Sequence, residues 1–105
     1  MTPKIGEIFM IDLGYQGKLR PAVVVSREDS QPPWALSVLV PLTSQSRGSR
    51  YEVTLPRVPW LRLQSHANVL AMASVQHHEL TDRRGRFEAS VVKQIKDAIS
   101  YAFDL

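Results

Sequence analysis

The residue best suited to chemistry in this sequence is an arginine that directly precedes a proline. Arg20 stands at the start of the apolar run PAVVVS, beside the rigid Pro21. A guanidinium held there at low entropic cost suits a group that meets negative charge. An arginine that pairs with Glu28 or Asp29, or is simply solvated, would explain the same pattern, so both explanations stay open.

A second candidate is the segment PLTSQSRGSR at positions 41–50. Thr43 ends an apolar run, and polar or basic side chains follow it, namely Ser44, Gln45, Arg47 and Arg50. Hydroxyl, amide and guanidinium groups are those that contact phosphates and base edges in nucleic acids. Serine and threonine also cap turns at strand ends, which is the alternative explanation.

The three histidines are candidates for proton transfer, because imidazole titrates near neutrality. We expect His66 in a loop that could fold over a site. His77 and His78 are adjacent, so on a strand they would face opposite ways and could not bind one metal ion together. No carboxylate or cysteine stands at ligand spacing from them, so we expect neither a metal site nor a cofactor. Glycine-rich phosphate loops, nucleophile elbows and paired carboxylates are also missing.

The charge of the chain is compatible with a polyanionic partner. The net charge is +3 and nine of the 13 basic residues are arginine, which binds phosphate bidentately. Between Ser30 and His78 there is one carboxylate, Glu52, and four cations: Arg47, Arg50, Arg57 and Arg62. A solvated surface that happens to use arginine would give the same composition.

Short strands must position these residues. The patterns predict strands over 6–12, 21–26, 35–43, 51–56 and 68–75, polar connections over 27–34, 44–50 and 77–88, and a long loop that carries Trp60. Apolar residues at helical spacing predict a helix over 90–103 with Ser90 as its N-cap. We expect one domain, a small and strongly bent antiparallel sheet or barrel with the helix on one side, and Trp34 as a plug of one barrel end.

The chain lacks cysteine, a signal-peptide pattern and an apolar run of membrane-spanning length. We therefore expect a cytoplasmic protein without disulfides and without a membrane partner.

Taken in order, the segments GEIFMIDLG, GKLRPAVVVS, VLVPLTSQSRG, YEVTLP and NVLAMASV, followed by the closing helix, resemble the MazF/PemK family of endoribonuclease toxins. The resemblance runs over nearly the whole chain. It implies a small SH3-like antiparallel barrel with a C-terminal amphipathic helix over residues 1–105, usually as a homodimer. It also implies metal-independent cleavage of single-stranded RNA, often mRNA, by 2′-OH attack, with 2′,3′-cyclic phosphate and 5′-OH products. The implied partner is an acidic antitoxin.

The resemblance also implies roles for individual residues. Arg20 stands where the family has its catalytic arginine, and Thr43 where it has its catalytic threonine. The residues expected on the RNA path are Lys18, Ser44, Gln45, Arg47 and Arg50. The loop over 14–19 is expected to lie over the RNA.

One departure from the family concerns proton transfer. Many members carry an aspartate in the strand that matches NVLAMASV, where this sequence has Met72 and Ala73. Either another group, such as His66 or Glu79, supplies the general base, or the protein is an RNA-binding module that cleaves slowly or not at all. A third possibility, inhibition of DNA gyrase as by the CcdB-like toxins, depends on a C-terminal Trp-Gly-Ile, whereas this sequence ends in Phe-Asp-Leu.

Overall fold

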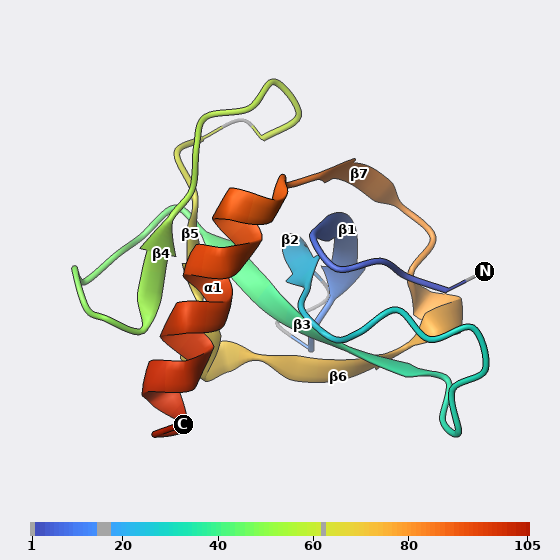
Figure 1. Cartoon of the computed structure of the whole chain (residues 1–105). Coiled ribbons are helices and arrows are strands. Elements are labelled where there is room, and N and C mark those ends of the chain that lie inside the picture. The colour runs from blue at the N-terminus through green and yellow to red at the C-terminus, as the bar shows by residue number, and fades with distance from the viewer. Residues whose placement is uncertain (1, 15–17, 62) are drawn as a thin grey trace.

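A computed structural model describes residues 2–14, 18–61 and 63–105. Within them the strands are β1 (Glu7–Asp12), β2 (Leu19–Val24), β3 (Leu36–Thr43), β4 (Glu52–Thr54), β5 (His66–Asn68), β6 (Ala73–Gln76) and β7 (Arg83–Arg86). Two 3-10 turns, η1 (Val69–Ala71) and η2 (His77–Glu79), flank β6, and helix α1 (Ala89–Ala102) follows β7 (Figure 1).

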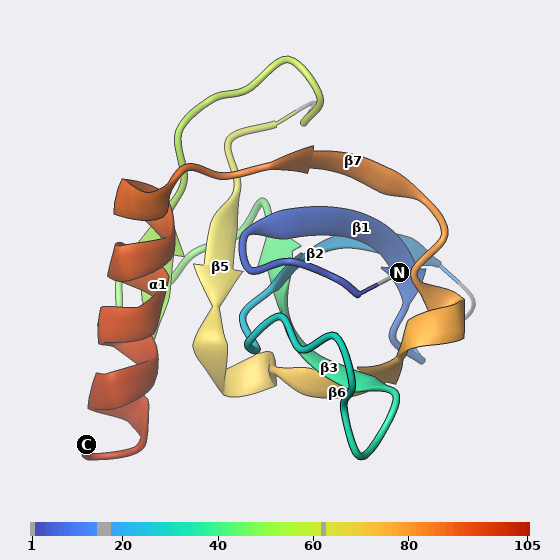
Figure 2. The ribbon, with the colours of Figure 1, turned by 45° about the vertical axis from the view of Figure 1, so that its right-hand side comes forward.

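The strands form one curved sheet in the order β4-β5-β3-β2-β1-β7, and β6 pairs with the first half of β3. Every pairing within the described residues is antiparallel. The sheet curls on itself and α1 lies against one side of it (Figure 2). The predicted mainly β fold, an antiparallel sheet with a C-terminal helix, is confirmed.

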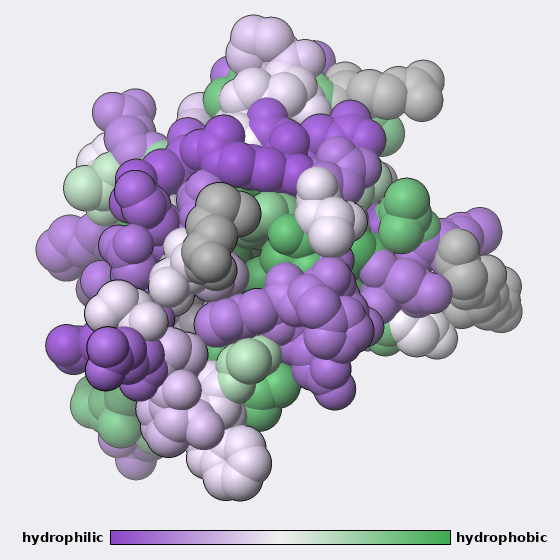
Figure 3. Space-filling view, turned by 90° about the vertical axis from the view of Figure 1, so that its right-hand side faces the viewer, coloured by the Kyte–Doolittle hydropathy of each residue, from purple (hydrophilic) through white to green (hydrophobic). Residues whose placement is uncertain are grey.

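Two hydrophobic clusters hold this arrangement together. The larger one lies between the sheet and α1, and the predicted helical stripe supplies its helix side through Val91, Val92, Ile95 and Ala98. The smaller one fills the curl of the sheet with Phe9, Ile11, Ala22, Val24, Leu39, Val75 and Leu80. On the face shown in Figure 3, hydrophobic residues are visible in a gap between two hydrophilic bands and at several places along the rim.

The prediction of one strand over 68–75 is wrong, because η1 interrupts it. The side-chain oxygen of Asn68 accepts a hydrogen bond from the backbone N–H of Leu70, and the N–H of Met72 donates to the carbonyl of Val69. These local bonds turn the chain. As a result β5 pairs with the end of β3 at Leu42 and Thr43, while β6 pairs with its first half.

Part of the predicted polar connection over 77–88 is strand β7. Its backbone pairs with β1, and Gly85 lies directly under the ring of Trp60, where a Cβ atom would come within 2.5 Å of the ring. The Trp60 ring also packs against Phe87, with 5.2 Å between ring centroids. Trp60 therefore covers this end of the sheet, whereas Trp34 is 74% exposed and the prediction that it plugs the barrel is wrong.

The helix begins one residue earlier than predicted. Its N-cap is Glu88, whose carbonyl accepts from the N–H groups of Val91 and Val92, so Ser90 lies inside the first turn. None of the helices in the described ranges has the length and apolarity needed to cross a bilayer.

Candidate functional site

Arg20 and Thr43 come together at the end of the β2–β3 pair. The last registered pair of these strands is Ala22 opposite Pro41. Arg20 precedes Ala22 by two residues, and Thr43 follows Pro41 by two residues. Because side chains alternate along a strand, Arg20 and Thr43 are on the same face of the sheet as Ala22 and Pro41. Both residues line one cavity of about 300 Å³. Arg20 is part of β2, which begins at Leu19 rather than at the predicted Pro21.

The remaining wall of this cavity, here called the Arg20 cavity, is largely apolar. The apolar residues are Met10, Leu19, Pro21, Leu42, Trp60, Leu61 and Leu63, and the other polar ones are Ser44, Ser65 and Arg84. A pocket with apolar walls and a few convergent polar groups is the usual form of a ligand site.

Arg84 was missed by the sequence analysis. It lies on β7, where every side chain but that of Gly85 is an arginine and no alternation of polar and apolar residues marks a strand. Asp82 accepts from Nε and Nη2 of Arg84 at 2.9 and 3.1 Å. The hydrogen bond from Arg84 lowers the pKa of Asp82, and the same bond raises the pKa of Arg84. A second guanidinium, which Asp82 holds, thus lines the Arg20 cavity.

Thr43 also lines a second, larger cavity of about 640 Å³, here called the loop cavity. Its other walls are Gln45, Ser46, Arg47, Ser49, Tyr51, Glu52, Asn68 and Leu70. Thr43 therefore belongs to the walls of both cavities. Of the residues predicted on the RNA path, Ser44 lines the Arg20 cavity, and Gln45 and Arg47 line the loop cavity.

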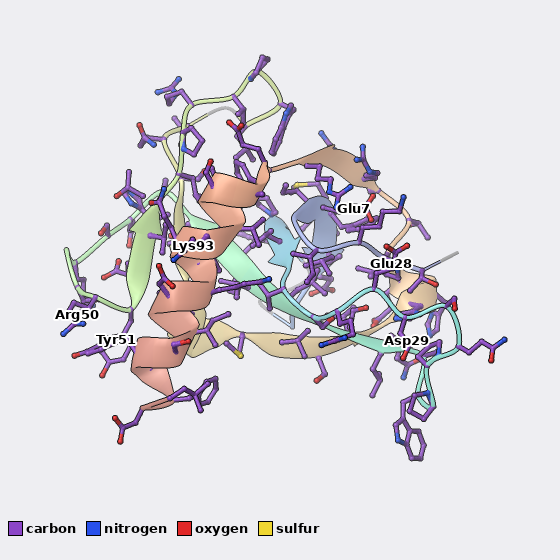
Figure 4. The ribbon with its side chains drawn as sticks, in the orientation of Figure 1. Glu7, Glu28, Asp29, Arg50, Tyr51 and Lys93 are labelled. Atoms are coloured by element: carbon purple, nitrogen blue, oxygen red, sulfur yellow. The ribbon has the colours of Figure 1, made fainter. Side chains whose placement is uncertain are left out.

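The other two predicted residues line neither cavity. Lys18 is exposed, two residues before Arg20. The guanidinium of Arg50 lies 3.9 Å from the centre of the Tyr101 ring and so connects the loop before β4 to the end of α1. Figure 4 shows Arg50 and Tyr51 beside the C-terminal half of the helix. Residues 15–17 of the loop predicted to cover the RNA lie outside the described residues.

The loop over 44–51 folds around the carboxylate of Glu52. Both oxygens accept from the N–H of Arg47, at 3.2 and 3.0 Å, and one also accepts from the N–H and the hydroxyl of Ser49, at 3.2 and 2.7 Å. The Ser49 hydroxyl, followed by the Arg47 N–H, lowers the pKa of Glu52 to about 2. The carboxylate thus fixes the backbone that carries Arg47.

Replacing Glu52 by Gln should lower stability in a pH-dependent way. The folded-state pKa of Glu52, about 2, is below its ordinary value of 4.5, so the stabilisation is fully present above 4.5 and is lost as the pH falls through the folded value. We therefore expect wild type and Glu52→Gln to differ in urea midpoint by a constant amount above about pH 5 and to converge between about pH 4.5 and 2.

The control is Glu28→Gln, which removes an exposed carboxylate from another loop. Its urea midpoint should equal that of wild type at each pH. A difference between wild type and Glu52→Gln that stays the same down to pH 2 would contradict the role given to the Glu52 charge.

The two residues considered as a general base, His66 and Glu79, lie in different parts of the structure. His66 lies on β5 rather than in a loop, opposite Thr43 on one side and Thr54 on the other. Glu79 is in the turn η2, where its carboxylate accepts from the N–H of Gln76 in a capping box. Only His66 of these two is next to a predicted catalytic residue.

The positions of Met72 and Ala73 carry no ionisable group. Met72 packs on the larger hydrophobic cluster, and Ala73 pairs with Leu39 at the start of β6. Among the described residues, no group of three or more His, Cys, Asp or Glu side chains could hold a metal ion.

Comparison with known proteins gives one family. The family model described as "PemK-like, MazF-like toxin of type II toxin-antitoxin system" matches residues 4–103. Among curated proteins, none matches the chain.

Solved structures with the same fold cover nearly the whole chain. An endoribonuclease in complex with its cognate antitoxin, from a mycobacterial species, is 25% identical with a TM-score of 0.85, covering 98% of this chain and 96% of that chain. The Mycobacterium tuberculosis toxin MazF-mt6 is 27% identical with a TM-score of 0.81, covering 94% of this chain and 97% of that one. A MazE-MazF structure from Deinococcus radiodurans, 21% identical with a TM-score of 0.79, covers 100% and 98% and shows the fold alone.

Proposed function

The chain belongs to the PemK-like, MazF-like toxin family of type II toxin–antitoxin systems, and from this premise we propose that it is an endoribonuclease that cuts single-stranded RNA without a metal ion. The observation that carries the proposal is the shared cavity of Arg20 and Thr43. These two residues come from different strands, and they are the ones for which the family resemblance predicts catalytic roles.

The proposed chemistry fits the groups at this cavity. The ribose 2′-OH attacks the adjacent phosphorus, and negative charge builds on the non-bridging phosphate oxygens in the transition state. A fixed guanidinium and a hydroxyl donor oppose that charge, which is the strongest kind of contribution such groups make. Since the RNA supplies the nucleophile, the protein needs no activated serine or cysteine.

The two cavities that share Thr43 support an RNA path through this point. The Arg20 cavity offers a second guanidinium, Arg84, and the ring of Trp60 in a largely apolar wall. The loop cavity offers Gln45 and Arg47. Charged groups of this kind position a backbone, and apolar or aromatic walls suit an unstacked base. Lys18 and Arg50, which line neither cavity, remain proposed RNA contacts on the basis of the family resemblance.

A second candidate function is RNA binding without cleavage. It is supported by one observation, the absence of any ionisable side chain at Met72 and Ala73. Loss of a positioned proton-transfer group lowers a rate by about 10²–10⁴-fold while leaving charge stabilisation in place.

We extend the proposal to the partners. An acidic antitoxin would cover the basic groups of the two cavities, and the compared mycobacterial endoribonuclease is in complex with its cognate antitoxin. The homodimer and the cytoplasmic location are proposed from the family resemblance. Size-exclusion chromatography with light scattering tests the dimer directly.

The test of the activity is to incubate the protein with single-stranded RNA in EDTA and to map the new ends. We expect 5′-OH ends and 2′,3′-cyclic phosphates at a small set of sequences. The control is the same RNA with a 2′-deoxy sugar at the mapped linkage, which should not be cut there. If no RNA is cut but binding falls steeply with salt, the binding function replaces the cleavage function.

A further inference from the structure

We propose that His66 is the catalytic residue that accepts the proton of the attacking 2′-OH. The inference depends on the proposed ribonuclease function and deepens it, because it assigns the proton transfer that Met72 and Ala73 cannot perform. It is carried by the placement of His66 in the sheet and by the hydrogen bond that holds its ring.

His66 belongs to a row of side chains that crosses four neighbouring strands. It is the registered partner of Thr43 on β3 and of Thr54 on β4. Directly opposed residues on neighbouring strands share a face, with Cβ atoms about 4.5–5.5 Å apart. Arg20 on β2 and Thr43 on β3 each lie two residues beyond the last paired residues of these strands, Ala22 and Pro41, and both line the Arg20 cavity. The row therefore reads Arg20, Thr43, His66, Thr54.

The buried neighbours of this row identify the face. Leu42, Val53 and Ala67 are next to the row residues in sequence and are buried in the cluster under α1. Since side chains alternate along a strand, Thr43, Thr54 and His66 point to the opposite face, away from the helix. This is the face on which Thr43, Glu52 and Asn68 border the loop cavity. The Arg20 cavity also includes Leu42, Trp60 and Leu61 from the helix side, and His66 itself lines neither cavity.

The ring of His66 is held by Thr54. Its Nδ1 and the Thr54 hydroxyl oxygen are 3.1 Å apart, in hydrogen-bond contact. When Nδ1–H donates to the hydroxyl, Nε2 carries the lone pair and is the acceptor needed for general-base catalysis. A base oriented by a third group is the usual construction of proton-transfer sites.

The other candidates close to the site are engaged elsewhere. The carboxylate of Glu52 accepts from the backbone of its own loop, and Asp82 is paired with Arg84. His77 hydrogen-bonds through Nε2 to the hydroxyl of Ser37 at 2.9 Å, and Glu79 caps η2. Of the described imidazoles and carboxylates named here, His66 alone is registered opposite Thr43.

Nε2 of His66 takes the proton as the 2′-O–H bond breaks and the 2′-O–P bond forms. The P–O5′ bond breaks, and the leaving 5′-oxygen takes a proton from water. The imidazolium then returns its proton to solvent. Arg20 and Thr43 donate to the phosphate oxygens throughout.

The test compares His66→Ala with wild type in single-turnover cleavage of a short RNA. We expect the rate constant to fall by about 10²–10⁴-fold while the Kd for the RNA stays close to that of wild type. Free imidazole added to His66→Ala should restore part of the rate, which a merely structural role would not allow. His78→Ala, which removes an exposed imidazole in η2, is the matched control and should cleave like wild type.

Two further variants keep the outcome clear. His66→Gln retains a polar side chain opposite Thr54 and should lose as much rate as His66→Ala. Thr54→Val should lower the rate by a smaller factor in wild type and have no further effect on His66→Ala, since Thr54 acts only through the ring.

The results distinguish failure of the proposed ribonuclease function from failure of the role proposed for His66. A wild-type protein that cuts no RNA refutes the proposed function itself. If the wild type cuts RNA, this cleavage requires Arg20, and His66→Gln cleaves at the wild-type rate, then the role of His66 is refuted and the proposed ribonuclease function is kept. A loss in folded His66→Ala that imidazole cannot restore also overturns it.

Discussion

Arg20→Ala is expected to lower the rate of RNA cleavage by about 10²–10³-fold, the size of effect seen when one donor to a developing oxyanion is removed. The guanidinium lies on a strand rather than on a flexible loop, in the wall of the cavity that also holds Thr43. Removing it deletes both charge and hydrogen bonds at the proposed phosphate position. Single-turnover cleavage of a labelled RNA measures the loss.

The matched controls use the same residue type. Arg20→Lys keeps the charge but not the planar, bidentate donor geometry, so we expect a rate between those of wild type and Arg20→Ala. Arg27→Ala removes an exposed arginine after the other end of β2 and should leave the rate unchanged. Cleavage that persists in a folded Arg20→Ala protein would refute the assignment of this residue.

Ile95→Ala is expected to lower the free energy of unfolding by about 2–5 kcal/mol, the range for deleting a large aliphatic side chain in a core. Ile95 is 0% exposed and lies in the middle of the buried stripe of α1. It packs in the cluster that joins the helix to β-strand residues such as Val40 and Leu42. Because Ile95 is enclosed between the helix and the sheet, we expect the cavity left by the change to close only partly. Urea unfolding followed by circular dichroism measures the change.

The control for Ile95 is its neighbour Lys96, which is exposed. Lys96→Ala keeps a strong helix former on the solvent side and should change the free energy of unfolding by less than about 0.5 kcal/mol. Equal effects of the two substitutions would show that α1 does not seal the core as described.

The sequence predicted the elements whose pattern is local. The helix followed from its apolar spacing, and the strands β1 to β4 followed from alternating or continuous apolar segments bounded by glycine, proline and polar residues. The family resemblance predicted that Arg20 and Thr43 would act together, and the register of β2 and β3 brings them to one cavity. Strands β2 and β3 are consecutive in the chain and pair with each other, so the contact between their ends could be predicted from the sequence.

The features that were missed depend on contacts between distant segments. Strand β7 has no apolar alternation, because its outer side is solvated and its inner side is a glycine covered by Trp60. Arg84 was therefore left in a connection. His66 was expected in a loop, since nothing in QSHAN marks a strand of three residues. Its place next to Thr43 comes from the pairing of β5 with β3, which no local pattern encodes.

The row Arg20, Thr43, His66, Thr54 also makes the site sensitive to local opening. Two of its members lie on β5 and β4, which are three residues long; β4 forms one edge of the sheet, and β5 is the strand next to it. Short edge elements open at lower free energy than the global transition. If the row is the catalytic apparatus, warming or mild urea should silence the enzyme reversibly while the rest of the sheet and its helix are still folded, so that inactivation precedes denaturation.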